Sequence, residues 1–167
     1  MENNIVGGFC SMKLTDFVVE SAIITELKAT EKEAIIREML CSLKDAQKIN
    51  NKDVENIIKS VMKREELGST GIGKGVAVPH TKHDAVKKIV GTVARSTHGV
   101  DFNALDGEPV HLFFLLLSPN DSAGSHLAAL ERISTVIRDN DFRRFMRDAS
   151  GKEGIIEIIK EVDGIQV

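Results

Sequence analysis

The chain has 167 residues, of which 42% are hydrophobic, so it can form one domain that buries about two-thirds of its unfolded surface without a cofactor or a disulfide. Its 22 basic and 25 acidic side chains are interspersed and give a formal net charge of -3, so no basic stripe points to a nucleic-acid partner. No apolar run approaches the roughly 20 residues of a membrane-spanning helix, and we expect no direct membrane insertion.

The N-terminal residues 1–11 are expected to be a disordered extension, and residues 12–167 to form the single domain. The apolar stretch of the extension is too short for a secretory signal. Cys10 follows the large Phe9, where the cleavage site of a lipid-anchored protein needs a small residue. Because Cys10 and Cys41 lack metal-ligand spacing, a reduced, cytoplasmic protein is indicated, with a disulfide between them as the alternative.

The first half of the chain predicts two amphipathic helices. Thr30 and Glu33 have the spacing of a capping box, and apolar residues on one helical face predict a helix over residues 31–46. A second apolar stripe, at offsets of three and four residues, predicts a helix that begins after Asn51 and ends near residues 66–68.

The middle of the chain predicts strands. Residues 68–75 are rich in glycine and are expected to be a loop that leads into a short strand over residues 76–79. Runs of apolar or β-branched residues predict further strands over residues 89–96 and 111–117, the second apolar enough to lie mid-sheet. A turn is expected between them at Asp106-Gly107.

The last part of the chain predicts helices. Apolar spacing indicates a helix over residues 125–138, closed by Asn140, and shorter helices are expected over residues 142–148 and 153–162. Helices on both flanks of interspersed strands predict an α/β fold, namely a single-domain sandwich in which a mixed β-sheet is flanked by helices.

The glycine-rich segment partly matches a nucleotide-binding loop. Gly68 to Lys74 fits the start of the pattern G-x-x-x-x-G-K-[ST], but Gly75 stands where a hydroxyl should hold magnesium. The order of elements is also the reverse of that motif, because here a helix is predicted before the loop and a strand after it, whereas the motif requires a strand and then a helix. A nucleotide-binding protein that uses Gly68–Gly75 is one alternative function, and a tight connection between helix and strand is the simplest explanation of the glycines.

A histidine follows this segment directly. Pro79 fixes its own backbone torsion, so His80 is presented rigidly beside a loop of small residues. The stretch from Glu65 to His80, EELGSTGIGKGVAVPH, closely resembles the active-site signature of the fructose/mannitol-type enzyme IIA domains of the bacterial phosphotransferase system, including the nitrogen-regulatory branch. The resemblance extends from about Lys13 to Val162.

The resemblance implies a phosphotransferase component whose His80 accepts a phosphoryl group from the carrier protein HPr. It matches the family's arginine before the glycine loop to Arg64, and its second histidine to His126. Thr81 departs from the pattern, which usually has Gly, Ala or Cys there, and this leaves the shape of the phosphate pocket open. The implied acceptor is an enzyme IIB or a regulatory target protein.

Histidine is suited to accepting a phosphoryl group and passing it to another protein. Its ordinary pKa of about 6.5 leaves a free lone pair near neutral pH, and a phosphoramidate is labile enough to be passed on. Phosphoryl transfer depends mostly on positioning and charge neutralisation. We expect Arg64 to neutralise the phosphate charge and His126 to act as a stabiliser of the phosphoryl group. The residues expected in a phosphate-binding loop are Ser69, Thr70, Gly71, Gly73 and Thr81.

Two further alternatives remain open. A metal site from His80 and His83 with His126 or His111 lacks acidic or cysteine ligands at suitable spacing, and we expect no metal and no cofactor. We expect His83 and His98 in loops and His111 at the start of a strand.

The other alternative is a regulatory protein-binding module of the nitrogen-regulatory type, with no role in sugar transport.

Overall fold

A computed structural model describes residues 12–165 of the chain. The predicted extension over residues 1–11, including Cys10, lies outside the described residues, and that prediction stays open. Cys41 lies in a helix and is a free cysteine.

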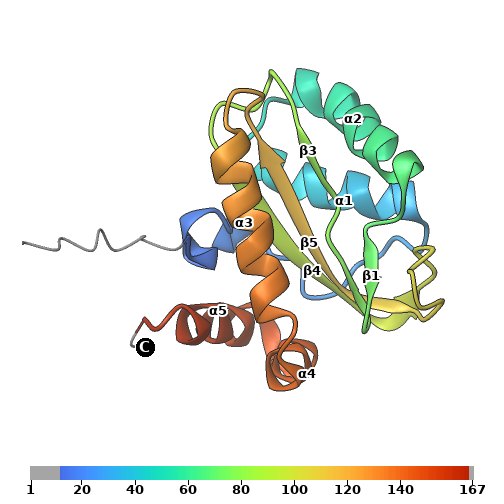
Figure 1. Cartoon of the computed structure of the whole chain (residues 1–167), viewed down its shortest axis with the longest axis vertical. Helices are drawn as coiled ribbons and strands as arrows, with labels where there is room; N and C mark the ends of the chain where they lie inside the picture. The colour runs from blue at the N-terminus through green and yellow to red at the C-terminus, as the bar shows by residue number, and fades with distance from the viewer. Residues whose placement is uncertain (1–11, 166–167) are drawn as a thin grey trace, which may run out of the picture.

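The described residues form helices on both sides of a mixed sheet (Figure 1). The helices are α1 (Lys32–Asp45), α2 (Val54–Leu67), α3 (Ala123–Val136), α4 (Asn140–Asp148) and α5 (Gly151–Val162), with short 3-10 helices at Leu14–Asp16, Glu20–Ala22 and Asn51–Asp53. The strands are β1 (Gly71–Gly73), β2 (Val76–Ala77), β3 (His80–Lys82), β4 (Val90–Val100) and β5 (Val110–Ser118). The predicted α/β fold with a mixed sheet flanked by helices is confirmed.

Strand β5 is the centre of the sheet. It runs antiparallel to β4 and, along its other edge, parallel first to β2 and then to β3. In this register Val76 lies opposite Leu112, and His80 lies opposite Leu116. Strands β2 and β3 therefore form one line that is interrupted only between Ala77 and His80.

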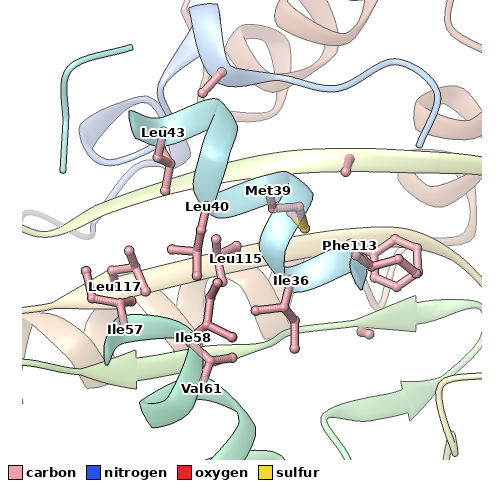
Figure 2. Close-up of a cluster of buried hydrophobic side chains, with 14 of the residues drawn as sticks. Ile36, Met39, Leu40, Leu43, Ile57, Ile58, Val61, Phe113, Leu115 and Leu117 are labelled. Carbon is pink, nitrogen blue, oxygen red and sulfur yellow. The ribbon is translucent and has the colours of Figure 1, made fainter. Parts of the chain in front are cut away.

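Alternate side chains of β5 point to opposite faces of the sheet. On one face Phe113, Leu115 and Leu117 pack against α1 and α2 in one buried cluster, and Figure 2 shows these side chains meeting. On the other face Leu112 and Leu116, among others, pack against α3, α4 and α5 in a second cluster. Any residue of the sheet can therefore be assigned to the α1–α2 face or to the α3 face.

The predicted helices are all present, but the predicted capping box is wrong. Helix α1 has Glu31 at its N-cap, and no side chain caps it. The backbone that leads into the helix is held elsewhere, because the Glu38 carboxylate accepts hydrogen bonds from the amides of Lys28 (3.1 Å) and Ala29 (2.9 Å). This carboxylate, which belongs to α1 itself, binds the backbone before the helix, and the Thr30 side chain makes no capping bond.

The prediction that residues 68–75 are wholly irregular is also wrong. Gly71–Gly73 form β1, which pairs antiparallel with β2. Lys74 and Gly75 connect the two strands with φ values of 58° and 77°, and positive φ at both central residues is the geometry of a two-residue type I′ hairpin turn. The hairpin ends the predicted strand early, so His80 begins a new strand, β3, instead of following the end of one.

Thr92 of β4 offers a test of this packing. Its side-chain oxygen is buried and has no hydrogen-bond partner among the described residues. Because a buried hydroxyl without a partner costs stability, Thr92→Val should raise the free energy of unfolding by about 1 kcal/mol, measured by chemical denaturation.

Thr81→Val is the matched control. The Thr81 hydroxyl lies 2.6 Å from that of Ser60, so the same change there should lower the free energy of unfolding. A less stable Thr92→Val variant would contradict the packing described for β4.

Candidate functional site

His80 is fixed by the backbone on both sides of it. The Pro79 carbonyl accepts a hydrogen bond from the amide of Leu116 (3.0 Å), and His80 itself pairs with Leu116 in β5. The half-buried imidazole has its Nδ1 2.7 Å from the Val78 carbonyl oxygen. A carbonyl oxygen can only accept a hydrogen bond, so Nδ1 carries the hydrogen, and the neutral ring has its lone pair on Nε2.

Burial lowers the pKa of His80 and is the largest influence on it. The hydrogen bond to Val78 acts in the opposite direction, the positive charge of Arg64 lowers the pKa further, and the carboxylate of Glu65 raises it. The net direction is downward. The ring is therefore neutral near pH 7, with its Nε2 lone pair available.

His126 lies next to His80 although the two are far apart in the sequence. It is in the first turn of α3, is 7% exposed, and its ring centre is 5.5 Å from that of His80 at an interplanar angle of 52°. Its Nδ1 lies 2.7 Å from the Ser118 hydroxyl oxygen. Burial, followed by the charges of His80 and Lys82, lowers the pKa of His126 to about 4, so this ring is also neutral near pH 7.

Helix α3 begins earlier than its sequence pattern predicts. Its first residue is Ala123, and the His126 amide already donates to the Ser122 carbonyl (2.9 Å). The backbone amides free of intrahelical partners are therefore those of the residues before His126, while His126 contributes its side chain.

Arg64 supplies the positive charge of the site. It lies in the last turn of α2, is half-buried, and donates from Nη1 to the Gly68 carbonyl (2.9 Å). Its charge lowers the pKa of His80, so the guanidinium acts electrostatically on that ring. Within residues 12–165 this is its one hydrogen bond, and a guanidinium has five N–H donors in a rigid fork.

The start of the glycine-rich segment is held by a buried carboxylate. Glu65 accepts hydrogen bonds from the amide (3.1 Å) and the hydroxyl of Thr70, and its Oε2 lies 3.0 Å from Nζ of Lys32. The ammonium group of Lys32 also lies 4.5 Å from the centre of the Phe102 ring. Glu65 is not among the site residues predicted from the sequence, although its position four residues after Val61 places a charge on the apolar face of α2.

The predicted loop residues have partners of their own. Ser69 donates its hydroxyl to the Phe102 carbonyl (2.8 Å) and accepts from the Gly71 amide (3.0 Å), while Thr70 is bound to Glu65. A Cβ on Gly71 would lie 2.9 Å from Cα of Ala104, so that glycine permits a close backbone approach. Gly73 lies in the hairpin, with a φ of 100°.

Thr81 faces away from His80. It is the next residue along β3, so its side chain points to the α1–α2 face, where its hydroxyl lies 2.6 Å from that of Ser60 in α2. His126, in α3, lies on the opposite face together with His80. The structure therefore brings His80, His126 and Arg64 into one site, while Thr81, the departure from the family pattern, lies behind the sheet.

The other histidines are engaged elsewhere. His83 accepts a hydrogen bond at Nδ1 from the Ala85 amide (3.0 Å), and Nδ1 of His111 lies 2.9 Å from the Ser96 carbonyl oxygen. His98 is exposed but lies in β4, so its predicted position in a loop is wrong. Between residues 12 and 165, no three His, Cys, Asp or Glu side chains are grouped so that they could hold a metal ion. No helix in the same span is long and apolar enough to cross a bilayer.

These features define a class of site: two neutral imidazoles in contact, one with a free lone pair, beside a guanidinium. The chain matches the family model described as the EIIA 2 component of the phosphoenolpyruvate-dependent sugar phosphotransferase system over residues 16–162. The protein therefore belongs to the type-2 EIIA family, whose members are phosphotransfer components of that system.

Similar proteins include both branches of the family. The chain is 34% identical over 148 residues to a nitrogen regulatory protein of Bradyrhizobium diazoefficiens, covering 89% of this chain and 95% of that protein. It is 35% identical over 152 residues to a fructose-specific EIIABC component of Bacillus subtilis, covering 91% of this chain but only 24% of that protein. The crystal structure of the nitrogen regulatory protein IIA-Ntr from Neisseria meningitidis has a TM-score of 0.77 and 31% identity, covering 86% of this chain and 97% of that one.

The buried Glu65 pair predicts a large effect on stability. The Glu65 side chain is 2% exposed, and its removal would leave Lys32 and the Thr70 amide without their acceptor. Glu65→Ala should lower the free energy of unfolding by about 3 kcal/mol. Glu55→Ala is the control because the Arg37–Glu55 pair is exposed, and its denaturation curve should stay unchanged. Equal effects of the two changes would contradict the role given to Glu65.

The low pKa of His126 predicts a pH dependence of stability. The ring binds its proton near pH 6.5 when unfolded but only near pH 4 when folded, so the unfolded state binds more protons between these values. The stability due to a neutral His126 is therefore complete above about pH 6.5 and is lost as the pH falls toward 4. We expect wild type to lose more stability than His126→Gln over this window. The free energy of unfolding of both proteins would be measured by chemical denaturation at each pH. Parallel plots of this free energy against pH would contradict the burial of the His126 ring.

Proposed function

We propose that the protein is a phosphohistidine carrier, in which Nε2 of His80 accepts a phosphoryl group from an HPr-like donor. The observation that supports this best is the contact between Nδ1 of His80 and the Val78 carbonyl, which leaves the lone pair on Nε2. The resemblance of residues 65–80 to the family signature and the membership of the family agree with it.

The transfer is balanced without removal of a proton from His80. The P–N bond of the donor breaks, its electron pair returns to the donor ring, and the lone pair of Nε2 forms the new P–N bond. Nδ1 keeps its hydrogen, so the phosphorylated ring carries a positive charge that the Val78 carbonyl stabilises. A protonated ring is also the better leaving group, which favours onward transfer.

The neighbouring groups stabilise the phosphoryl oxygens. Arg64 can direct further N–H groups at them and neutralise their charge. His126 contributes a neutral imidazole from the first turn of α3, where the unpaired amides and the helix dipole also favour an anion. The predicted loop residues Ser69, Thr70, Gly71 and Gly73 then act indirectly, by holding the hairpin that leads to His80.

The partners are proteins that dock over His80. Leu67, at the end of α2, is 83% exposed, and Leu127, next to His126, is 66% exposed. Exposed apolar side chains at the rim of a site indicate a protein surface as the partner. We propose an HPr-like donor and, as acceptor, an enzyme IIB or a regulatory target protein, with the reaction taking place in the cytoplasm.

The carrier and the regulator differ in what happens downstream of His80. The relatives include both a fructose-specific component and nitrogen regulatory proteins. A sugar carrier should lose transport in the His80→Ala variant. A regulator should keep one partner in that variant but lose its response to phosphorylation, which a binding assay with the partner would show.

The nucleotide-binding alternative is disfavoured by the loop itself. The amides of Thr70, Gly71 and Lys74 are bound to Glu65, Ser69 and Asp106, so they do not point at an open anion site. A titration with ATP and magnesium should show no saturable binding.

Incubation with phosphoenolpyruvate, enzyme I and HPr tests the carrier function directly. Mass measurement of the intact protein and its peptides should find one modification, stable in base and labile in acid, on the peptide that contains His80. His80→Ala should abolish it, and His83→Ala should leave it unchanged. A stable modification on another peptide would overturn the proposal.

The docking surface predicts a second result. Leu127→Asp should weaken the productive encounter with the donor and raise its KM by about tenfold, with little change in kcat and in the denaturation curve. Phe145→Asp is the control, because Phe145 is 50% exposed on α4, which follows the C-terminal end of α3, whereas His126 is in the first turn of α3. Equal effects of both changes would indicate that Leu127 lies outside the docking surface.

A further inference from the structure

Ser118 links the sheet to the second histidine of the site. It is the last residue of β5, is fully buried, and pairs with Lys82 of β3. Its carbonyl accepts a hydrogen bond from the His83 amide (2.9 Å), so its backbone is held along β3. Its hydroxyl oxygen lies 2.7 Å from Nδ1 of His126. This hydroxyl has no part in the proposed transfer of a phosphoryl group from the donor to His80.

We propose that Ser118 is a positioning residue, whose hydroxyl donates to Nδ1 of His126 and thereby holds the hydrogen of that ring on Nε2. This inference rests on the proposed function for its consequence in phosphoryl transfer, but the arrangement of hydrogens that it assigns belongs to the unphosphorylated protein.

The direction of the hydrogen bond follows from the donors available. Either the hydroxyl donates to the ring or Nδ1–H donates to the hydroxyl. Within residues 12–165 His126 is the one hydrogen-bond partner of the Ser118 hydroxyl. If the ring donated, the hydrogen of the fully buried Ser118 hydroxyl would have no acceptor. If the hydroxyl donates, the donor without a protein partner is instead the Nε2–H of His126, and that nitrogen is not one of the buried atoms left unpaired between residues 12 and 165, so it can reach solvent. An unsatisfied buried donor is the more costly arrangement.

The consequence is a neutral donor at the phosphoryl site. With Nδ1 accepting from Ser118, the hydrogen of the His126 ring lies on Nε2, the nitrogen that is not bound to Ser118. Burial keeps the ring neutral near pH 7. Such a ring can donate one hydrogen bond to a phosphoryl oxygen on His80, whose ring centre is 5.5 Å away. In the opposite tautomer Nε2 would present a lone pair to the anion and repel it.

The two rings of the site are held in opposite tautomers by their hydrogen-bond partners. The Val78 carbonyl, which only accepts, places the hydrogen of His80 on Nδ1 and its lone pair on Nε2. The Ser118 hydroxyl, which donates, places the lone pair of His126 on Nδ1 and its hydrogen on Nε2. His80 thus presents a nucleophile to phosphorus, and His126 presents a hydrogen-bond donor to the phosphoryl oxygens.

Nitrogen NMR of the unphosphorylated protein tests the assignment. In a sample with ¹⁵N-labelled histidine, the two-bond ¹H–¹⁵N spectrum at pH 7 should show His126 with an unprotonated Nδ1 and a protonated Nε2. In Ser118→Ala the shifts of the two nitrogens should move toward each other as the tautomers mix. Ser118→Thr, which keeps the hydroxyl, should restore the wild-type pattern.

The matched control is Ser60→Ala. It removes a similar hydroxyl, 2.6 Å from that of Thr81, on the other face of the sheet, and it should leave the His126 shifts unchanged. A wild-type spectrum with the hydrogen on Nδ1 of His126 would overturn the proposal, even if the Ser118→Ala variant did not fold. Shifts in folded Ser118→Ala that match those of wild type would overturn it as well.

The rate of phosphoryl transfer separates this inference from the proposed function. Ser118→Ala should slow phosphorylation of His80 by about tenfold, which corresponds to one lost hydrogen bond in the transition state, and Ser118→Thr should restore the rate. Failure of wild type to become phosphorylated would refute the carrier function while leaving the tautomer assignment intact. An unchanged rate in Ser118→Ala would refute the role of Ser118 while leaving the carrier function intact.

Discussion

The parallel pairing of β3 with β5 is the constraint on which the site depends. It sets His80 opposite Leu116 and Lys82 opposite Ser118, so His80 and Ser118 both point to the α3 face. A shift of one residue in this register would turn His80 toward α2 and exchange it with Thr81. The break in the edge strand at Pro79 is compatible with this pairing because Pro79 contributes only its carbonyl, which accepts from Leu116.

The glycine-rich segment serves this register more than it serves an anion. The hairpin of β1 and β2 brings the chain back onto β5 at Val76, and the buried Glu65 holds the start of the segment through Thr70 and Lys32. A buried carboxylate with three hydrogen bonds, one of them from the cation Lys32, is stable only as a complete set. The chain between Arg64 and His80 is therefore held at its start by a charged network that lies among α1 and α2, away from His126.

Local patterns in the sequence predict the helices and most strands because periodicity reports which residues face a core. They also indicate that His80 is held rigidly after Pro79 and the glycines, but its role as phosphoryl acceptor, like the roles of Arg64 and His126, comes from the family resemblance. The pairing register of β3 is not encoded locally, so the orientation of Thr81 could not be predicted. Ser118 ends an apolar run of β5 and has no motif around it, and its role depends on a helix that arrives later in the chain.

A carrier must bind a phosphoryl group without keeping it, and the electrostatics of the site meet this requirement by burial. Burial lowers the pKa of both His80 and His126, so under the proposed function the anion would meet two neutral rings, with positive charge from Arg64 beside His80 and from Lys82 near His126. Arg64 is itself half-buried and shares its guanidinium with the Gly68 carbonyl. A cation in place of the neutral His126 would bind the phosphorylated state more tightly and slow the release of the phosphoryl group. An interaction that stabilises the bound state and the transition state equally does not lower the barrier to transfer.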